Sequence, residues 1–569
     1  MKIERNKRIF LADDLTIQSW EDIKPYFDNL IERKLESEID LFNWLSDRSE
    51  LDAVLEEALA WRYIRMSIET TDEAKSEAYK LFVTKIQPEL APLDDILNKK
   101  LMTCPFRFHF EKDEAYRIYF RSLDIQLQLF REENIPLEAE LNEMAQQYGA
   151  ISAAQMIEHN GEKMTMQKAA LLLKEQEESI RKEVFEKMAE RRREDIEKLD
   201  NLYSELIKKR HQLALNAGFE NFRDYKFQAL GRFDYTKEDC FAFHAAIQEL
   251  IVPLVKQIQL KKLEKLGKER FKPWDTEVDP EGKAPLKPFQ SGKEMLDGAI
   301  AIFNKIDPFF GDCLVTMNEM GHLDLESKPG KAPGGYNYPL YEIGVPFIFM
   351  NAVGAQRDLV TMVHEGGHAI HSFLSRDLAL TGFKNLPSEV AELASMSMEM
   401  LTMNYWDAFY TNVDDLNRAK REQLEGILKI LPWIAQIDAF QHWVYENVNH
   451  SITERHAHWR KLSVDYGTGL TDWTGFEDMI DSAWQRQLHL FEVPFYYIEY
   501  GIAQLGALGV WMNSLNDFQK AIDDYKAALQ LGNSRSIPEI YKTANVKFDF
   551  SADYLRGLAQ FIGENLQKL

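Results

Sequence analysis

Apolar side chains recur at the three- and four-residue spacing of amphipathic helices along most of the 569-residue chain. Residues 17 to about 150 predict a succession of such helices with prolines between them. Within this stretch, Ser49 is placed to cap a helix that begins near residue 51. The pattern stays helical and strongly charged from residue 166 to about 216, and it is mostly helical again after residue 386.

The period changes in a few short stretches. An Asn-Gly dipeptide within residues 155–165 predicts a β-hairpin, followed by a helix that starts near residue 165. Residues 313–317 and 321–325 alternate between apolar and polar side chains, and residues 346–351 form a short β-prone run. These three runs predict a small sheet.

The predicted fold is therefore mainly α-helical, with a small β-sheet. A chain of this length is too long for one simple core, so two lobes are expected. We place an N-terminal helical lobe, which includes the hairpin, at residues 1–200. The second lobe spans residues 201–569 and contains the candidate chemistry described below, and the two lobes can interleave.

Composition narrows the possible partners. A net charge of −24 argues against binding to nucleic acid or to anionic membranes, which require basic patches. The three cysteines are far apart and odd in number, so they imply neither a disulfide framework nor a thiolate zinc site. The first residues have no apolar signal segment, and about 18 uninterrupted apolar residues occur nowhere. We expect a cytoplasmic protein.

Residues 364–368 have the sequence H-E-G-G-H, flanked on both sides by an apolar helical stripe. On a helix, His364 and His368 project from one face, about 40° apart. Two imidazoles so placed can hold one Zn²⁺, and Glu365 can reach a water on the open metal position. Gly366 and Gly367 each cost roughly 1 kcal/mol relative to Ala inside a helix, which suggests that something approaches the backbone closely there.

A zinc ion with two histidine ligands needs a third protein ligand. Glu392 lies 24 residues beyond His368 on a second predicted helix, and it would complete a His₂Glu site. Glu389 is one turn earlier on nearly the same face, so spacing alone leaves both open. Glu399, two turns later, suits a role in orienting an imidazole.

His371 shares the helix face of the two motif histidines. Seven residues of helix rise about 10 Å, whereas zinc–nitrogen bonds are about 2 Å long. One metal ion cannot reach both ends of that row. We interpret His371 as a buried histidine or as a residue that supports the ligands.

Three motifs together resemble one known family. They are H-E-G-G-H-A at residues 364–369, S-E-V-A-E-L-A-S-M-S-M-E at residues 388–399 and P-F-Y-Y-I-E-Y-G-I-A at residues 494–503, and residues 346–351 add to them. The chain resembles the thimet oligopeptidase and oligoendopeptidase F family of gluzincin metallopeptidases, and within it the bacterial oligoendopeptidase F and Pz-peptidase branch. The motifs cover about 160 residues, and weaker similarity extends over most of the chain.

This resemblance implies a residue for each catalytic role. His364, His368 and Glu392 would bind a single zinc ion, and Glu365 would be the general base. Tyr497 and Tyr500, together with His489, would match the residues of the family that bind substrate and stabilise the transition state. Tyrosine hydroxyls are suitable donors to an oxyanion, and the two tyrosines are three residues apart, so on a helix both face one way.

The resemblance also implies a two-lobed helical clamshell whose deep channel admits short peptides and excludes folded proteins. Candidate substrate-binding residues are Gly334 and Gly335 in a turn, and Phe347 and Phe349 in the predicted strand. A sheet beside the metal helix could pair with an extended peptide, although the two phenylalanines also fit a core. The branch commonly has a cysteine after this turn, where this chain has Asn337.

The favoured function is a zinc endopeptidase that hydrolyses internal bonds of short peptides. One alternative is an exopeptidase of related helical type, such as a dipeptidyl carboxypeptidase. Another is a catalytically silent peptide-binding protein, against which the intact Glu365 argues. Cleavage of a peptide with a capped C-terminus distinguishes the endopeptidase from the exopeptidase. Assay of a fluorogenic peptide with and without chelator tests whether the protein is a catalytically silent binder.

Overall fold

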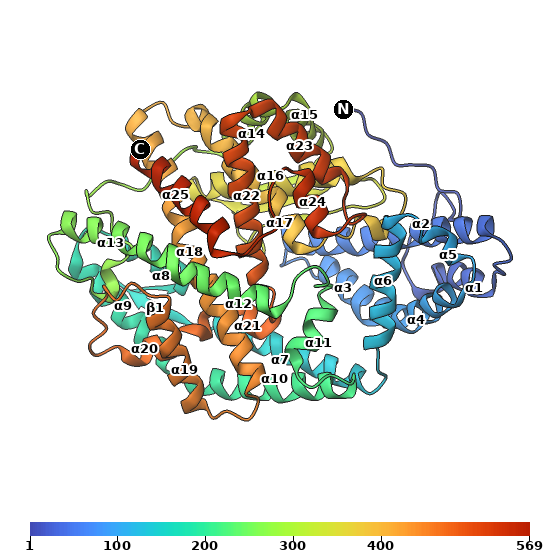
Figure 1. Ribbon diagram of the computed structural model, residues 1–569, viewed down its shortest axis with the longest axis horizontal. Coiled ribbons are helices and arrows are strands. Elements are labelled where there is room, and N and C mark those ends of the chain that lie inside the picture. The colour runs from blue at the N-terminus through green and yellow to red at the C-terminus, as the bar shows by residue number, and fades with distance from the viewer. The chain divides into compact units, whose positions relative to one another are not determined.

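The computed structural model describes residues 1–569, and it is mainly helical with two small sheets, which confirms the predicted fold class (Figure 1). Two compact units are formed by interleaved segments. Unit 1 comprises Met1–Gln128, Leu286–Lys420 and Ala503–Phe548; unit 2 comprises Leu129–Pro285, Arg421–Ile502 and Asp549–Leu569. The lobe boundary expected at residue 200 stays a prediction. None of the helices has the length and apolar character needed to cross a membrane.

Unit 1 contains the predicted metal helix. Its main elements are α1 (Lys24–Glu32), α2 (Glu38–Ile68), α3 (Glu73–Leu81), α4 (Gln87–Thr103), α5 (Arg107–Phe110), α6 (Glu114–Leu129), α14 (Gly292–Ile306), α15 (Pro308–Glu319), β3 (Leu323–Glu326), β4 (Tyr336–Tyr338), β5 (Phe347–Ala352), α16 (Gln356–Ser375), α17 (Ser388–Thr402), α23 (Phe518–Gln530) and α24 (Ile537–Thr543).

Unit 2 is helical apart from one hairpin, and two long helices contribute residues to both units. Its elements are α7 (Asn134–Ala153), β1 (Met156–His159), β2 (Glu162–Thr165), α8 (Met166–Leu172), α9 (Glu178–Arg193), α10 (Ile196–Asn216), α11 (Phe222–Ala229), α12 (Lys237–Ala246), α13 (Val252–Leu266), α19 (Ile452–Asp465), α20 (Glu477–Asp481), α21 (Leu488–Glu492) and α25 (Ala552–Lys568). The shared helices are α18 (Val413–Glu446) and α22 (Ile498–Asn516).

The predicted hairpin is confirmed, and two other local predictions are wrong. Strands β1 and β2 pair around the Asn-Gly turn, and Thr165 caps α8. Ser49 does not start a helix, because it lies inside α2, which Ser37 caps; the Ser49 hydroxyl bonds instead to Thr381. Residues 313–317 are helical because Asp307 caps α15 and the buried side chains follow helical spacing.

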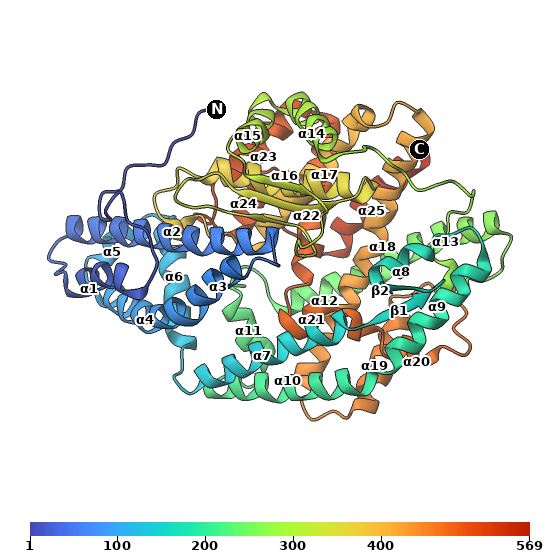
Figure 2. The ribbon, with the colours of Figure 1, turned by 180° about the vertical axis from the view of Figure 1, so that it is seen from behind.

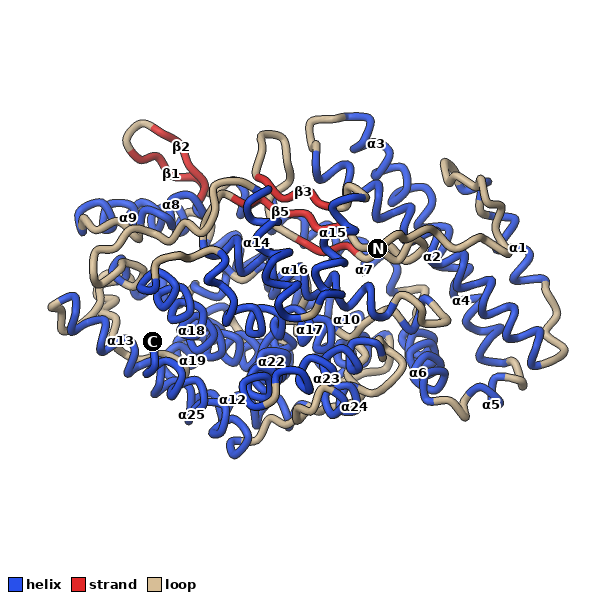
Figure 3. Tube along the Cα trace, turned by 90° about the horizontal axis from the view of Figure 1, so that it is seen from above, coloured by secondary structure: helices blue, strands red, loops and turns tan.

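The sheet of unit 1 has the strand order β3-β5-β4. Strand β5 lies in the centre, parallel to β3 and antiparallel to β4. The sheet packs against α16 (Figure 3), and the C-terminal half of α2, the long blue helix in Figure 2, packs on the same strands through Ala60 and Ile64. Since both sides of β5 are paired, an added peptide strand could pair only with β3 or β4.

The two motif glycines let neighbouring elements touch the backbone of α16. A Cβ at Gly367 would lie 2.6 Å from the Cα of Ser395 and 2.8 Å from the carbonyl oxygen of Ala394, both on α17. At Gly366 it would lie 2.5 Å from the ring of Phe303 on α14. These contacts supply the close approach that the glycines predict, and they fix the spacing of α16 and α17.

We expect Gly367→Ala to destabilise the protein by about 1–3 kcal/mol, the range for overpacking. The reason is that the new methyl group meets backbone atoms of α17, which outweighs the gain of roughly 1 kcal/mol in helix propensity. Gly426→Ala, inside α18 with open space at the Cβ position, is the matched control and should leave stability unchanged or raise it. Urea denaturation measures both. Equal stability of the two variants would contradict the packing argument.

Candidate functional site

Helix α16 forms because its N-terminus is capped and one face is apolar. The Asp358 carboxylate accepts hydrogen bonds from the backbone amides of Ala355 (2.9 Å) and Val353 (2.8 Å), which satisfies donors at the helix start. Further along, His364 and His368 stand on one face with their ring centroids 4.9 Å apart. Their side chains are 21% and 20% exposed, so each ring retains access to solvent.

Helix α17 brings a carboxylate to the two imidazoles. Oε2 of Glu392 lies 3.4 Å from Nε2 of His364 and 3.9 Å from Nε2 of His368. The three side chains offer ligand atoms that all lie within 4.8 Å of one another. Glu389, the alternative left open by sequence spacing, is buried on the same helix and is not part of this group.

Two further residues hold these ligand atoms in place. Oε1 of Glu399 lies 2.7 Å from Nδ1 of His364, as expected for a residue that orients an imidazole. The hydroxyl of Ser395 donates to Oε2 of Glu392 over 3.1 Å, a contact that the sequence reasoning missed. When Nδ1–H donates to Glu399, the lone pair of His364 Nε2 faces the carboxylate of Glu392.

The group attracts positive charge. Burial lowers the pKa of His364, but Glu399, Glu392 and Glu365 outweigh burial and raise that pKa to about 10. An imidazole lone pair that faces a carboxylate at 3.4 Å requires a proton or a cation between them. Two imidazole nitrogens and one carboxylate oxygen are a common donor set for zinc. The residues present therefore fit a divalent metal such as zinc.

Glu365 lies beside this group and is buried, with 7% of its surface exposed. Burial is the main cause that raises the pKa of its carboxyl group to about 7. Its backbone carbonyl accepts a hydrogen bond of 3.2 Å from Nδ2 of Asn337 on β4. Asn337 thus links the sheet to α16.

His371 differs from His364 and His368 in its burial and in its distance from the candidate ligands. It is 1% exposed, and burial lowers its pKa to about 3, so the ring is neutral. It is not part of the group of candidate ligands. Its position agrees with the interpretation of a buried histidine.

Two of the predicted substrate-binding residues lie in a turn, and the other two lie in the core. Gly334 has a φ of +98°, and its carbonyl oxygen accepts a hydrogen bond of 2.8 Å from Asn351. The turn leads directly through Gly335 into β4, an edge strand of the sheet. Phe347 and Phe349 are buried in β5 at 2% and 0% exposure, so their side chains are part of the core.

Unit 2 brings the three other predicted residues together. The ring of His489 lies 4.7 Å from that of Tyr497 and 6.0 Å from that of Tyr500, and the two tyrosine rings are 5.5 Å apart. Nδ1 of His489 lies 2.6 Å from Nε2 of Gln487, which can donate to it and so leave the proton on Nε2. Burial lowers the pKa of His489 to about 4, so the ring is a neutral donor.

The backbone before Tyr497 is held in an unusual conformation. Phe495 has a φ of +66°, in the left-handed region, which costs roughly 1–2 kcal/mol for a residue with a side chain. Its amide donates to Gln441 over 2.6 Å, and its carbonyl accepts from buried Arg232, which also pairs with Glu499 at 2.9 Å. No pattern in the sequence signals this strain, and strained backbone of this kind is frequent near functional sites.

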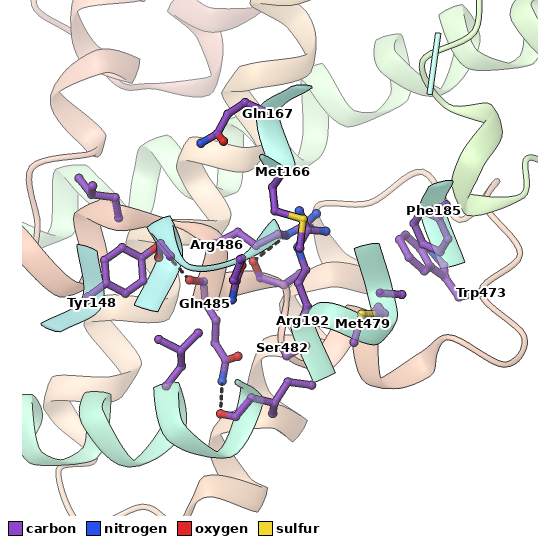
Figure 4. Close-up of a pocket in the computed structure, with 17 residues that line it drawn as sticks. Tyr148, Met166, Gln167, Phe185, Arg192, Trp473, Met479, Ser482, Gln485 and Arg486 are labelled. Carbon is purple, nitrogen blue, oxygen red and sulfur yellow. Dashed lines mark hydrogen bonds between the residues drawn. The ribbon is translucent and has the colours of Figure 1, made fainter. Parts of the chain in front are cut away.

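A separate cavity of about 260 Å³ lies within unit 2. Figure 4 shows Arg192, Arg486 and Tyr148 on its wall, and the Tyr148 hydroxyl donates to the carbonyl of Gln485 over 3.1 Å. None of the predicted site residues lines this cavity. The candidate chemistry therefore lies elsewhere, in the group on α16 and α17 and in the ring cluster of α21 and α22.

Curated proteins are similar to part of this chain. An "Oligoendopeptidase F homolog" from Borreliella burgdorferi is 22% identical over 391 residues, which are 66% of this chain and 63% of that protein. The "Oligopeptidase PepF" of Bacillus subtilis is 24% identical over 241 residues, 39% of this chain and 33% of that protein. The chain thus aligns with less than two-thirds of the length of these curated relatives.

A solved structure is similar over nearly the whole chain. The structure described as "PZ peptidase A with inhibitor 2" has a TM-score of 0.88 and 27% identity, and it covers 96% of this chain and 97% of that one. The model for the peptidase M3 N-terminal domain matches residues 12–130. The model for peptidase family M3 matches residues 171–560, well over half of the sequence, so this chain belongs to peptidase family M3.

Proposed function

We propose that this protein is a zinc-dependent endopeptidase that hydrolyses internal amide bonds of short peptides in the cytoplasm. The observation that supports this most directly is the group formed by Nε2 of His364, Nε2 of His368 and the carboxylate of Glu392, with Glu365 beside it. Family membership and the likeness to oligopeptidases support the same function.

In this proposal His364, His368 and Glu392 hold one zinc ion. When bound, the ion would polarise the scissile carbonyl and lower the pKa of a water molecule. Glu399 keeps His364 in the tautomer that presents Nε2, and Ser395 restrains the carboxylate of Glu392.

Glu365 acts in this proposal as general base and then as general acid. Its carboxylate takes a proton from the attacking water and passes it to the leaving amine. Burial raises the pKa of its carboxyl group, which strengthens it as a proton acceptor, and a bound cation would lower that pKa again. The hydroxyls of Tyr497 and Tyr500 and the Nε2–H of His489 are the proposed donors to the developing oxyanion.

The turn at Gly334 and Gly335 is the proposed contact for the peptide backbone. It leads into β4, which is an edge strand and can pair with an extended peptide. The buried side chains of Phe347 and Phe349 would contribute only by holding the sheet in place.

A doubly capped fluorogenic peptide tests the function. With acetyl and amide ends it lacks the free carboxylate that a dipeptidyl carboxypeptidase requires, so internal cleavage identifies an endopeptidase. We expect cleavage by the purified protein, its loss with a chelator and its return with Zn²⁺. Cleavage of the uncapped peptide alone would indicate the exopeptidase, and binding without cleavage of either peptide would indicate a silent binder.

Glu365→Gln should keep the fold and the metal but lose most activity, because the residue is the proposed base and not a ligand. Loss of general-base catalysis lowers kcat by roughly 10²–10⁴-fold. Zinc content by mass spectrometry and kcat with the capped peptide measure the two effects. Near-parent kcat in a zinc-replete variant would remove Glu365 from its proposed role.

Tyr500→Phe should lower kcat by about 10²–10³-fold with little change in KM, the result expected when one oxyanion donor is lost. Tyr497→Phe should have a similar or smaller effect. Tyr496→Phe is the matched control, since its ring contacts His489 and Tyr500 but it has no assigned hydroxyl role. If the three variants cleave peptides at the parent rate, the tyrosines serve only in packing.

A further inference from the structure

Two helices of unit 2 place a second set of metal-ligating side chains face to face. Cys240 and His244 are four residues apart on α12, and Asp438 and His442 are four residues apart on α18. Residues with this spacing share one helix face. Each helix therefore presents two side chains that can bind a metal, as α16 does with its two histidines.

The ligand atoms of these side chains are close together. Cys240, Asp438 and His442 offer one sulfur, one oxygen and one nitrogen that all lie within 4.8 Å of one another, as in the group on α16 and α17. Nε2 of His442 lies 3.2 Å from Oδ2 of Asp438. Ligand atoms around a tetrahedral zinc ion with bonds of about 2.0–2.3 Å are separated by about 3.3–3.7 Å, so this pair is already close to that separation.

The cluster is buried and its polar atoms are incompletely satisfied. Cys240 is 1% exposed, Asp438 0% and His442 2%. Oδ1 of Asp438 and Nδ1 of His442 have no hydrogen-bond partner. The contact between His442 Nε2 and Asp438 also lacks hydrogen-bond geometry, although the two atoms are near each other. A fully buried carboxylate oxygen without a donor is costly, and a cation would relieve that cost.

The surroundings favour a closed site over a catalytic one. The ring of His442 is 4.9 Å from that of Phe241, 5.8 Å from that of Phe227 and 5.5 Å from that of Phe495. Three phenylalanine rings therefore flank the imidazole, which otherwise faces Asp438 and lies 5.8 Å from the ring of His244. Nε2 of His244 lies 2.8 Å from Oδ2 of Asp438, so it can orient that carboxylate as outer residues of metal sites do.

We propose that Cys240, Asp438 and His442 bind a second zinc ion that stabilises unit 2, with His244 holding Asp438 in position. A thiolate and a carboxylate together neutralise the two positive charges of the ion, so the buried complex has no net charge. Cysteine, histidine and aspartate are all established zinc ligands, and a buried site is loaded as the chain folds. This inference goes beyond the proposed peptidase function and does not depend on it.

Metal stoichiometry of the full-length protein tests the proposal. After expression with zinc and removal of loosely bound metal, we expect two zinc ions per chain by mass spectrometry. Cys240→Ser and His442→Ala should each contain one, and His368→Ala should also contain one, because it affects the other group. Cys104→Ser is the control, since that buried cysteine is in unit 1 and outside both groups.

Cobalt substitution distinguishes the two groups without relying on a variant that folds poorly. Co²⁺ bound to a thiolate gives an intense near-ultraviolet charge-transfer band, and the group on α16 and α17 contains no cysteine. The cobalt form of the parent and of His368→Ala should show this band, and that of Cys240→Ser should lose it. Two results would overturn the second site: the absence of this band from the cobalt form of the parent, or two zinc ions retained by Cys240→Ser. Neither depends on the result for His368→Ala.

Discussion

The contact between α16 and α17 is the constraint on which the candidate site depends. Gly367 allows the backbone of α17 to approach within a distance that any side chain would block. That approach brings Glu392 within 3.4 Å of His364 and places Glu399 against the other nitrogen of the same ring. A wider separation of the two helices would leave the imidazoles on their own helix without a third donor. The glycines reduce helix propensity locally, and the close approach that they permit offsets this cost.

The electrostatics of the site follow from that packing. Three carboxylates, those of Glu365, Glu392 and Glu399, influence one partly buried imidazole. Burial separates them from water, and this raises the pKa of Glu365 and makes the carboxylates compete for positive charge. A metal ion would relieve their repulsion and lower the pKa of Glu365 at the same time. Burial disfavours three neighbouring carboxylates without a cation, and it therefore favours the binding of a cation among them.

Local signals in the sequence predicted much of the fold and the centre of the site. The helical period, the Asn-Gly turn and the spacing of His364 and His368 depend on neighbours in the chain, and each agrees with the structure. The strand predicted at residues 313–317 is wrong for a local reason, since Asp307 caps a helix there. Other errors and omissions arise from distant contacts. Ser49 bonds to Thr381 instead of capping a helix, and Asn337 on β4 donates to the carbonyl of Glu365 on α16. No spacing rule shows such contacts, because they depend on tertiary packing.

The two proposed metal groups share one arrangement of ligands on two helices, but their surroundings differ. In the first group, His364 and His368 lie four residues apart on α16 and meet Glu392 on α17. In the second, Asp438 and His442 lie four residues apart on α18 and meet Cys240 on α12. The imidazoles on α16 remain about one-fifth exposed, so water can reach them. The imidazole of His442 is 2% exposed and enclosed by phenylalanine rings. Catalytic zinc sites keep an open position, whereas structural sites are closed. Exposure, more than ligand identity, is therefore our reason for proposing catalysis at the group in unit 1 and a stabilising role for the group in unit 2.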